Sequence, residues 1–153
     1  MYEELKRSSC FQDLNTEQIA SILPCCSEVV LNDGDIMIHE GEQDSQDLFI
    51  LLSGSVEIVS SDSSITSSEV VLSSEDKDLY GEISWLTGGK RTASARCRGD
   101  VEAIRIDGIA LMQHLEKNTE AGFKVLRRIA LILSQRLEQS DSLMKQLLWN
   151  TNI

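Results

Sequence analysis

Proline, aromatic residues and long apolar runs are all scarce in this sequence. Its 153 residues include one proline, and aromatic side chains make up 5% of the chain. No apolar run approaches the roughly 20 residues that a membrane-spanning helix needs, so a spanning segment is not expected. The first residues, MYEELKRSSC, lack the basic-then-apolar order of a secretory signal. We therefore expect a cytoplasmic protein that is not attached to a membrane.

Basic residues are also few relative to acidic ones. The sequence has 14 Lys and Arg against 25 Asp and Glu, which gives a formal net charge of -11. Sequence-independent binding of nucleic acid depends on basic side chains that neutralise phosphates, and an anionic membrane surface makes the same demand. We expect no nucleic acid and no membrane among the partners of this chain.

Side chains that commonly bind metals are sparse and scattered. The four cysteines form no C-x-x-C pair, and the two histidines lie far apart in no metal-binding pattern. Adjacent Cys25 and Cys26 are poorly placed for a disulfide, so buried free thiols are expected in a reducing compartment. Metal-dependent chemistry of the cupin type would need clustered histidines. With no catalytic constellation in view, we expect neither a metal nor an enzyme.

The residues that are present indicate an α+β protein. A helix is predicted within DLNTEQIASILP, where Asn15 and Gln18 have capping-box spacing. Closely spaced β-rich runs with Gly, Asp, Asn and Ser between them predict an antiparallel, jelly-roll-like β-roll. The expected organisation is N-terminal helices in 1–24, the roll in 25–107 and helices in 108–149. The predicted strands are SEVVL, DIMIHE, DLFILLSGSVEIVS, SEVVLSS, TASARC and VEAIRI, and the serine-rich residues 60–68 are predicted to be a flexible hairpin tip.

The C-terminal helix shows two apolar stripes. The first follows alternating steps of four and three, as in a coiled-coil seam: Leu126, Ala130, Leu133, Leu137, Ser140, Met144 and Leu147. The second stripe consists of Val125, Ile129, Ile132 and Leu143. A helix with two stripes favours two partners, so we predict that the second packs on the roll. The seam then pairs with a second subunit in a parallel homodimer; the alternative is a helix laid only against its own sheet.

One stretch gathers glycines and basic residues around a carboxylate: YGEISWLTGGKRTASA, residues 80–95. Arg91 offers a planar, permanently charged fork that suits phosphate oxygens. Gly81 lets the backbone approach a ligand closely, and the run EISWLT can form a short helix whose first N–H groups point at an anion. The pattern favours a site for one small anion.

The order of helix, roll, Gly-Glu stretch and long helix resembles the cyclic-nucleotide-binding domain across essentially the whole chain. GDIMIHEGEQDSQDLFILLSGSVEIV is similar to the first half of that family, and residues 81–93 are similar to its phosphate-binding cassette. The resemblance implies a sensor of cAMP, with cGMP as the alternative, that relays binding through its C-terminal helix. The implied ligand-binding residues are Gly81, Glu82, Ile83, Ser84, Arg91, Thr92 and Ala93. Possible base contacts are Ile58, Val71, Arg136, Leu137, Ser140 and Asp141.

Several features depart from the family pattern. Trp85 replaces a small or aliphatic residue and could crowd the cassette helix, Lys90 replaces a common proline, and Lys77-Asp78 replaces Gly-Asp. The alternative function is a ligand-free β-roll that serves only dimerisation or protein interaction. In transcription factors of the family a DNA-binding domain follows the long helix, and these 153 residues contain none. We expect either a stand-alone sensor that acts on an unknown protein effector or a fragment of a longer chain.

Overall fold

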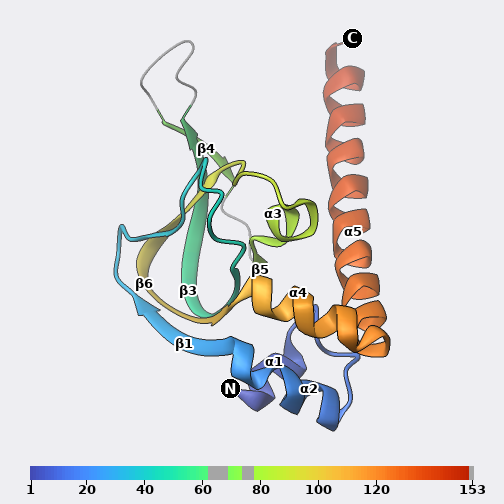
Figure 1. The fold of residues 1–153 in the computed structure, drawn as a ribbon. Coiled ribbons are helices and arrows are strands. Elements are labelled where there is room, and N and C mark those ends of the chain that lie inside the picture. Colours follow the sequence, from blue (N-terminus) through green and yellow to red (C-terminus); the bar gives the residue numbers. More distant parts are fainter. Residues whose placement is uncertain (62–68, 74–77, 152–153) are drawn as a thin grey trace.

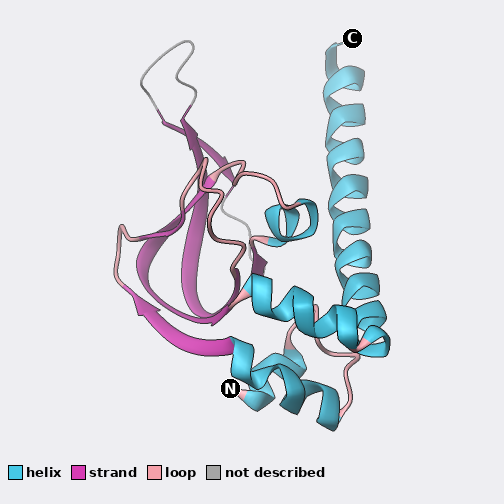
Figure 2. Ribbon diagram, in the orientation of Figure 1, coloured by secondary structure: helices cyan, strands magenta, loops and turns pink. Residues whose placement is uncertain are grey.

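The architecture is an antiparallel sheet curled into a roll, with helices at both ends of the chain (Figures 1 and 2). The structure is a computed structural model that describes residues 1–61, 69–73 and 78–151; the side chains of Ser61 and of 69–73 are outside the description. The elements are α1 (Tyr2–Arg7), α2 (Thr16–Ile22), a 3₁₀ turn η1 (Leu23–Cys25), β1 (Cys26–Leu31), β2 (Ile36–Ile38), β3 (Leu48–Ser61), β4 (Glu69–Ser73), β5 (Leu79–Tyr80), α3 (Glu82–Thr87), β6 (Ser94–Ile106), α4 (Gly108–Lys117) and α5 (Thr119–Thr151). The predicted fold class is confirmed.

Local signals in the N-terminal region are confirmed by the backbone. Asn15 accepts a hydrogen bond from the N–H of Gln18, and the Gln18 side chain accepts one from the N–H of Asn15, both at 2.9 Å. This reciprocal cap satisfies two N–H groups that a helix start leaves unpaired. Pro24 then lies in η1, where the chain leaves α2 and enters β1.

The sheet has the strand order β1-β6-β3-β4, with β2 paired to β6 and β5 paired to β3. Two details differ from the sequence expectation. TASARC and VEAIRI belong to one long strand, β6, and the two-residue strand β5 was not predicted. Gly54 lies inside β3, where the pairing with β6 shifts register between Ser53 and Ser55. The predicted hairpin joins β3 to β4, and its tip at 62–68 lies outside the described residues.

Alternation along the strands divides the core into two parts. In β3, Leu48 and Ile50 pack with the helices, whereas Phe49 between them points into the roll. Leu79 and Tyr80 of β5 divide in the same way. Successive side chains of a strand face opposite sides, so the same strands hold the helical layer and line the interior of the roll.

The long helix α5 rests on the core only along its first half. Ala121, Val125 and Ile129 are buried, whereas every residue from Leu137 to Thr151 is exposed. Of the stripe predicted to pack on the roll, Leu143 is 61% exposed, because by that point the helix has run past the other elements. Within the described part of the chain, no helix has the length and apolar character that crossing a membrane requires.

Candidate functional site

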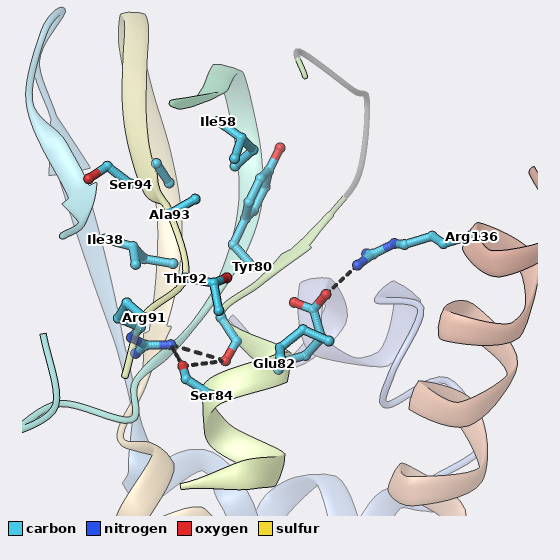
Figure 3. A pocket seen from close by; sticks show the side chains of 13 residues that line it. Ile38, Ile58, Tyr80, Glu82, Ser84, Arg91, Thr92, Ala93, Ser94 and Arg136 are labelled. Atoms are coloured by element: carbon cyan, nitrogen blue, oxygen red, sulfur yellow. Dashed lines mark hydrogen bonds and ion pairs between the residues drawn. The ribbon is translucent and has the colours of Figure 1, made fainter. Parts of the chain in front are cut away.

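A cavity of about 340 Å³ lies between the roll, α3 and α5 (Figure 3). Its apolar wall comes from strands β2, β3 and β6, and its polar end comes from α3 and the loop that leads into β6. The residues that line it are Ile38, Ile58, Tyr80, Gly81, Glu82, Ile83, Ser84, Arg91, Thr92, Ala93, Ser94, Ala95 and Arg136. This size and mixture of surfaces are typical of a small-molecule site.

Arg91 is held in the wall of this cavity by neutral acceptors. Its Nη1 donates to the carbonyl oxygen of Gly81 at 3.0 Å and to the Oγ of Ser84 (Figure 3), and its Nη2 donates to the carbonyl oxygen of Asp47 at 2.7 Å. Three fixed acceptors on two nitrogens leave the guanidinium little freedom to turn. The cation is therefore positioned before any ligand arrives.

Arg91 has no ion-pair partner in the part of the chain that the structure describes. Yet its side chain is only 5% exposed. Its Nε is buried without any hydrogen-bond partner in the same part of the chain. Burial lowers the pKa of Arg91, and the more distant carboxylates of Glu42, Asp47 and Glu82 oppose that shift. A buried cation without a counter-ion is costly by itself, and Arg91 lines the cavity, so the geometry suits an anion there.

Gly81 makes this arrangement sterically possible. Its φ is 93°, and a Cβ at this position would lie 2.6 Å from the carbonyl oxygen of Asp47 and 2.8 Å from Nη1 of Arg91. Gly81 also precedes α3 without a side-chain cap, so the first N–H groups of this short helix keep no intrahelical partner. Glycine at this position therefore brings the backbone and the guanidinium together at one end of the cavity.

Glu82 provides the second polar group, and it is tied to the long helix. Its side chain is 3% exposed, and its Oε1 accepts a hydrogen bond from Nη1 of Arg136 on α5, whose side chain is 27% exposed (Figure 3). No described group donates to Oε2 of Glu82. The cavity thus holds a fixed cation at one place and a carboxylate with a free acceptor oxygen at another.

Asp47 is a positioning residue that the sequence analysis missed. Besides its carbonyl contact to Arg91, its Oδ2 accepts from Nε of Arg105 at 2.6 Å, and its Oδ1 lies 3.4 Å from the N–H of Gly108. Asp47 contacts Arg91 through its main-chain carbonyl oxygen, and because every residue has such an oxygen, the residue type does not predict this contact. An acidic residue directly before the apolar run of β3 is the one clue that the sequence gives.

The described residues among the three departures, which are Trp85, Lys90 and Asp78, do not line the cavity. Trp85 is 5% exposed and belongs to the helical core, where its Nε1 donates to the carbonyl oxygen of Gly108 at 2.8 Å. The indole thus packs in the helical core and does not line the cavity. Lys90 is exposed. Asp78 accepts from the N–H and the Oγ of Ser9 at 2.8 and 2.5 Å, whereas Lys77 lies outside the described residues.

All seven cassette residues named from the sequence line the cavity. Of the possible base contacts, Ile58 and Arg136 also line it. Leu137, Ser140 and Asp141 are exposed on α5 and do not. Val71 lies in β4, where its backbone pairs with Val59 and its side chain is outside the description. Ile38, Tyr80, Ser94 and Ala95 join the cavity without having been predicted.

No feature of the described residues points to a metal. Groups of three or more His, Cys, Asp or Glu side chains able to hold a metal ion are absent there. All four cysteines are free thiols, as predicted; Cys10 and Cys97 are buried, and Cys25 and Cys26 are half-buried. Burial raises the pKa of Cys26 to about 12, with Cys25 adding to the shift.

Comparison with known proteins gives a family match and several relatives. The profile of the family described as "Cyclic nucleotide-binding domain" matches residues 28–118. A relative from Mycobacterium tuberculosis (strain CDC 1551 / Oshkosh), named "CRP-like cAMP-activated global transcriptional regulator", is 27% identical over 149 residues. The match covers 97% of this chain and 64% of that protein. The chain thus spans less than two thirds of the length of this relative.

Two solved structures show the same fold. A cyclic nucleotide-binding domain from Methylobacillus flagellatus KT superposes with a TM-score of 0.80 at 20% identity, covering 95% of this chain and 83% of that one. The regulatory domain of Toxoplasma gondii PKA in a co-crystal with cAMP superposes with a TM-score of 0.61 at 19% identity, covering 70% of this chain and 40% of that one.

Proposed function

The chain belongs to the family of cyclic nucleotide-binding domains, and from that premise we propose that its cavity binds a cyclic nucleotide, with cAMP as the first choice and cGMP as the second. The observation that carries the proposal is Arg91, a guanidinium that lines the cavity, is 5% exposed and has no carboxylate partner among the described residues. A cyclic phosphate supplies the missing anion.

The remaining groups of the cavity fit the other parts of such a ligand. Glu82 keeps Oε2 free to accept a hydrogen bond from a ribose 2′-hydroxyl while Arg136 holds Oε1. The N–H groups that open α3 lie beside Arg91 at the phosphate end. Ile38, Ile58 and Ala93 offer an apolar surface for sugar and base. These roles support the binding residues named from the sequence.

We assign the chain a regulatory role rather than a catalytic one. The relative from Mycobacterium tuberculosis is a transcriptional regulator by name. Here α5 contacts the cavity through Arg136 and presents its exposed seam, so we propose that ligand binding is relayed along this helix of a homodimer to a protein effector. With a net charge of -11, a nucleic acid is a poor partner for these 153 residues.

Ligand-dependent stabilisation tests the proposal most directly. Thermal unfolding of the whole chain is followed with cAMP, with cGMP and with 5′-AMP, which has an open phosphate. A ligand that binds only the folded state stabilises it by about 2.7 kcal/mol at 100 times its Kd. Arg91→Ala should remove this shift, and Arg98→Ala, at an exposed arginine of β6 outside the cavity, should keep it.

The exposed seam of α5 also fits the second function, a ligand-free dimerisation module. If neither nucleotide stabilises the chain and it still dimerises, this second function replaces the first. Calorimetry that gives equal affinity for the unmodified chain and Arg91→Ala would remove the residue on which the first function depends.

A further inference from the structure

The exposed stripe of α5 is longer than the sequence analysis gave it. Phe123 lies seven residues before Ala130 on the same face and is 66% exposed, so it adds a position to the seam. Numbered as a coiled coil, the a positions are Phe123, Ala130, Leu137 and Met144, and the d positions are Leu126, Leu133, Ser140 and Leu147. Leu126, Leu137, Met144 and Leu147 are each more than half exposed.

The e and g positions, which flank the seam, indicate the orientation and register in which two such helices would pair. In a parallel pair in register, each g residue lies beside the e residue five positions later in the other helix, and these positions set partner and orientation. The g positions are Gly122, Ile129, Arg136, Leu143 and Asn150, and the e positions are Arg127, Ser134, Asp141 and Leu148. The parallel register therefore matches Arg136 with Asp141, and Leu143 with Leu148.

The pairs Arg136–Asp141 and Leu143–Leu148 would both be favourable, and their side chains can still make contacts with a second chain. Leu143 and Leu148 are 61% and 59% exposed, so pairing would bury two apolar side chains that otherwise face solvent. Asp141 is exposed on the free half of α5, where no described residue forms an ion pair with it. Arg136 faces the other way, toward α3, and uses one nitrogen on Glu82. A guanidinium has five N–H donors, so it can bind a second carboxylate at the same time.

For the homodimer already proposed, with the two α5 helices parallel and in register, we propose that Arg136 binds Glu82 of its own cavity and Asp141 of the partner subunit together. The cavity wall and the subunit interface would share one guanidinium. The ion pair needs no ligand; only its consequence for the cavity, that Asp141 of the partner subunit helps hold Glu82 in place, depends on the proposed function.

A charge exchange between two chains tests the pairing. Asp141→Lys places like charges beside Arg136 in its own dimer, and Arg136→Glu places like charges beside Asp141. Each variant alone should dimerise about tenfold more weakly at low salt, since two exposed ion pairs per dimer are lost. Mixed together, the two variants should form a heterodimer with both pairs restored, measured by sedimentation and native mass spectrometry. Added salt should weaken the preference.

Matched variants separate this register from its rivals. Glu138→Lys makes the same charge change on an exposed b position and should leave dimerisation unaltered. An antiparallel pair brings e positions together, so an Arg127→Glu chain, and not Arg136→Glu, would then rescue Asp141→Lys; that result would overturn the proposal. Full-strength dimerisation of Asp141→Lys, or an unmodified chain that stays monomeric, would overturn it as well.

Arg136→Glu places a second carboxylate beside Glu82 and could prevent folding, so a pair of neutral substitutions provides a second test. Arg136→Gln and Asp141→Asn should each weaken the dimer, and the double variant should weaken it no further than the stronger single one, as expected for directly coupled residues. Strictly additive losses would contradict the contact. All dimer measurements are made without nucleotide, so a failure to bind cAMP or cGMP would sink the proposed function and leave this result standing.

Discussion

The Nε1 of Trp85, in α3, donates a hydrogen bond at 2.8 Å to the carbonyl oxygen of Gly108, the first residue of α4. A Cβ on Gly108 would lie 1.8 Å from the carbonyl oxygen of Gln46 and 2.8 Å from Cδ1 of Trp85. The helix that borders the cavity is thus packed directly against the helix that leads to α5. Both residues act in the core rather than in the cavity.

Gly108→Ala should destabilise the fold by about 1–3 kcal/mol, because the new methyl group forces the backbone near Gln46 and the indole apart. Trp85→Phe, which removes only the hydrogen bond and part of the ring, should cost about 1 kcal/mol. Urea unfolding followed by circular dichroism gives both values. Gly89→Ala is the control, since Gly89 has no positive φ and meets only the Thr87 hydroxyl at 3.2 Å. An unchanged free energy of unfolding in Gly108→Ala would contradict the close packing of Gly108 against Gln46 and Trp85.

Gly81→Ala should weaken nucleotide binding at least about tenfold, because its Cβ displaces Nη1 of Arg91 from the anion end of the cavity. Gly88→Ala is a matched control. Gly88 also has a positive φ, of 72°, yet no atom lies within 4 Å of its added Cβ. The control should lose about 1–2 kcal/mol of stability through backbone strain alone and keep its affinity in calorimetry. Equal affinity loss in both variants would mean that strain, not Arg91, explains the effect.

Some parts of the fold followed from local sequence. The cap formed by Asn15 and Gln18 depends on residues three apart, and the first strands follow runs of apolar and β-branched residues. The single long strand β6 could not be predicted in this way, because Gly99 and Asp100 are typical turn residues and indicated a turn between two strands. In the structure they remain within β6, whose long pairing with β3 and β1 overrides that local preference.

The cavity likewise combines residues that the sequence predicts with residues that only the fold brings together. Its cassette residues are close in sequence, so their spacing placed them together, whereas Ile38 and Tyr80 reach the wall through strand pairing. Asp47 acts on Arg91 with a main-chain oxygen that any residue carries. Leu143 was assigned to the roll because its stripe is apolar, but helix periodicity cannot tell where the neighbouring elements end.

Charged residues in the α5 seam should produce monomers. Leu137→Glu combined with Met144→Glu places carboxylates at two a positions that are 64% and 59% exposed in the single chain, so the subunit itself should stay folded. Light scattering gives the assembly state, and circular dichroism checks the fold. Gln139→Glu, on an exposed position outside the seam, is the control. Double variants that still dimerise would place the interface elsewhere.

Thr92→Val should shift the balance between nucleotides. Thr92 lines the cavity, and its hydroxyl can accept a hydrogen bond from the amino group that guanine carries and adenine lacks at that position. Loss of one hydrogen bond of about 1 kcal/mol corresponds to about fivefold weaker cGMP binding, with cAMP little changed. Competitive binding of both nucleotides measures the ratio. An unaltered ratio would leave Thr92 without a part in base choice.

Alkaline pH should destabilise the fold partly through Cys10. Burial raises the pKa of this thiol far above its ordinary value of 9.0, so the folded state keeps a proton that the unfolded chain loses. The contribution is complete below pH 9 and declines above it, by about 1.4 kcal/mol per pH unit for one thiol. Urea unfolding from about pH 8 to about pH 10 should show a shallower decline for Cys10→Ala. Cys25→Ala is the comparison: because Cys25 is only half-buried, this variant should change the alkaline decline in stability less than Cys10→Ala does.

Beyond Arg136, α5 continues to Thr151 with every side chain exposed. At 1.5 Å per residue this free part is about 23 Å long. A tilt of about 10° at Arg136 would therefore carry the far end of a rigid helix through about 4 Å. Such a rod is a lever, and whatever touches its tip would sense a displacement several times larger than any movement at the cavity.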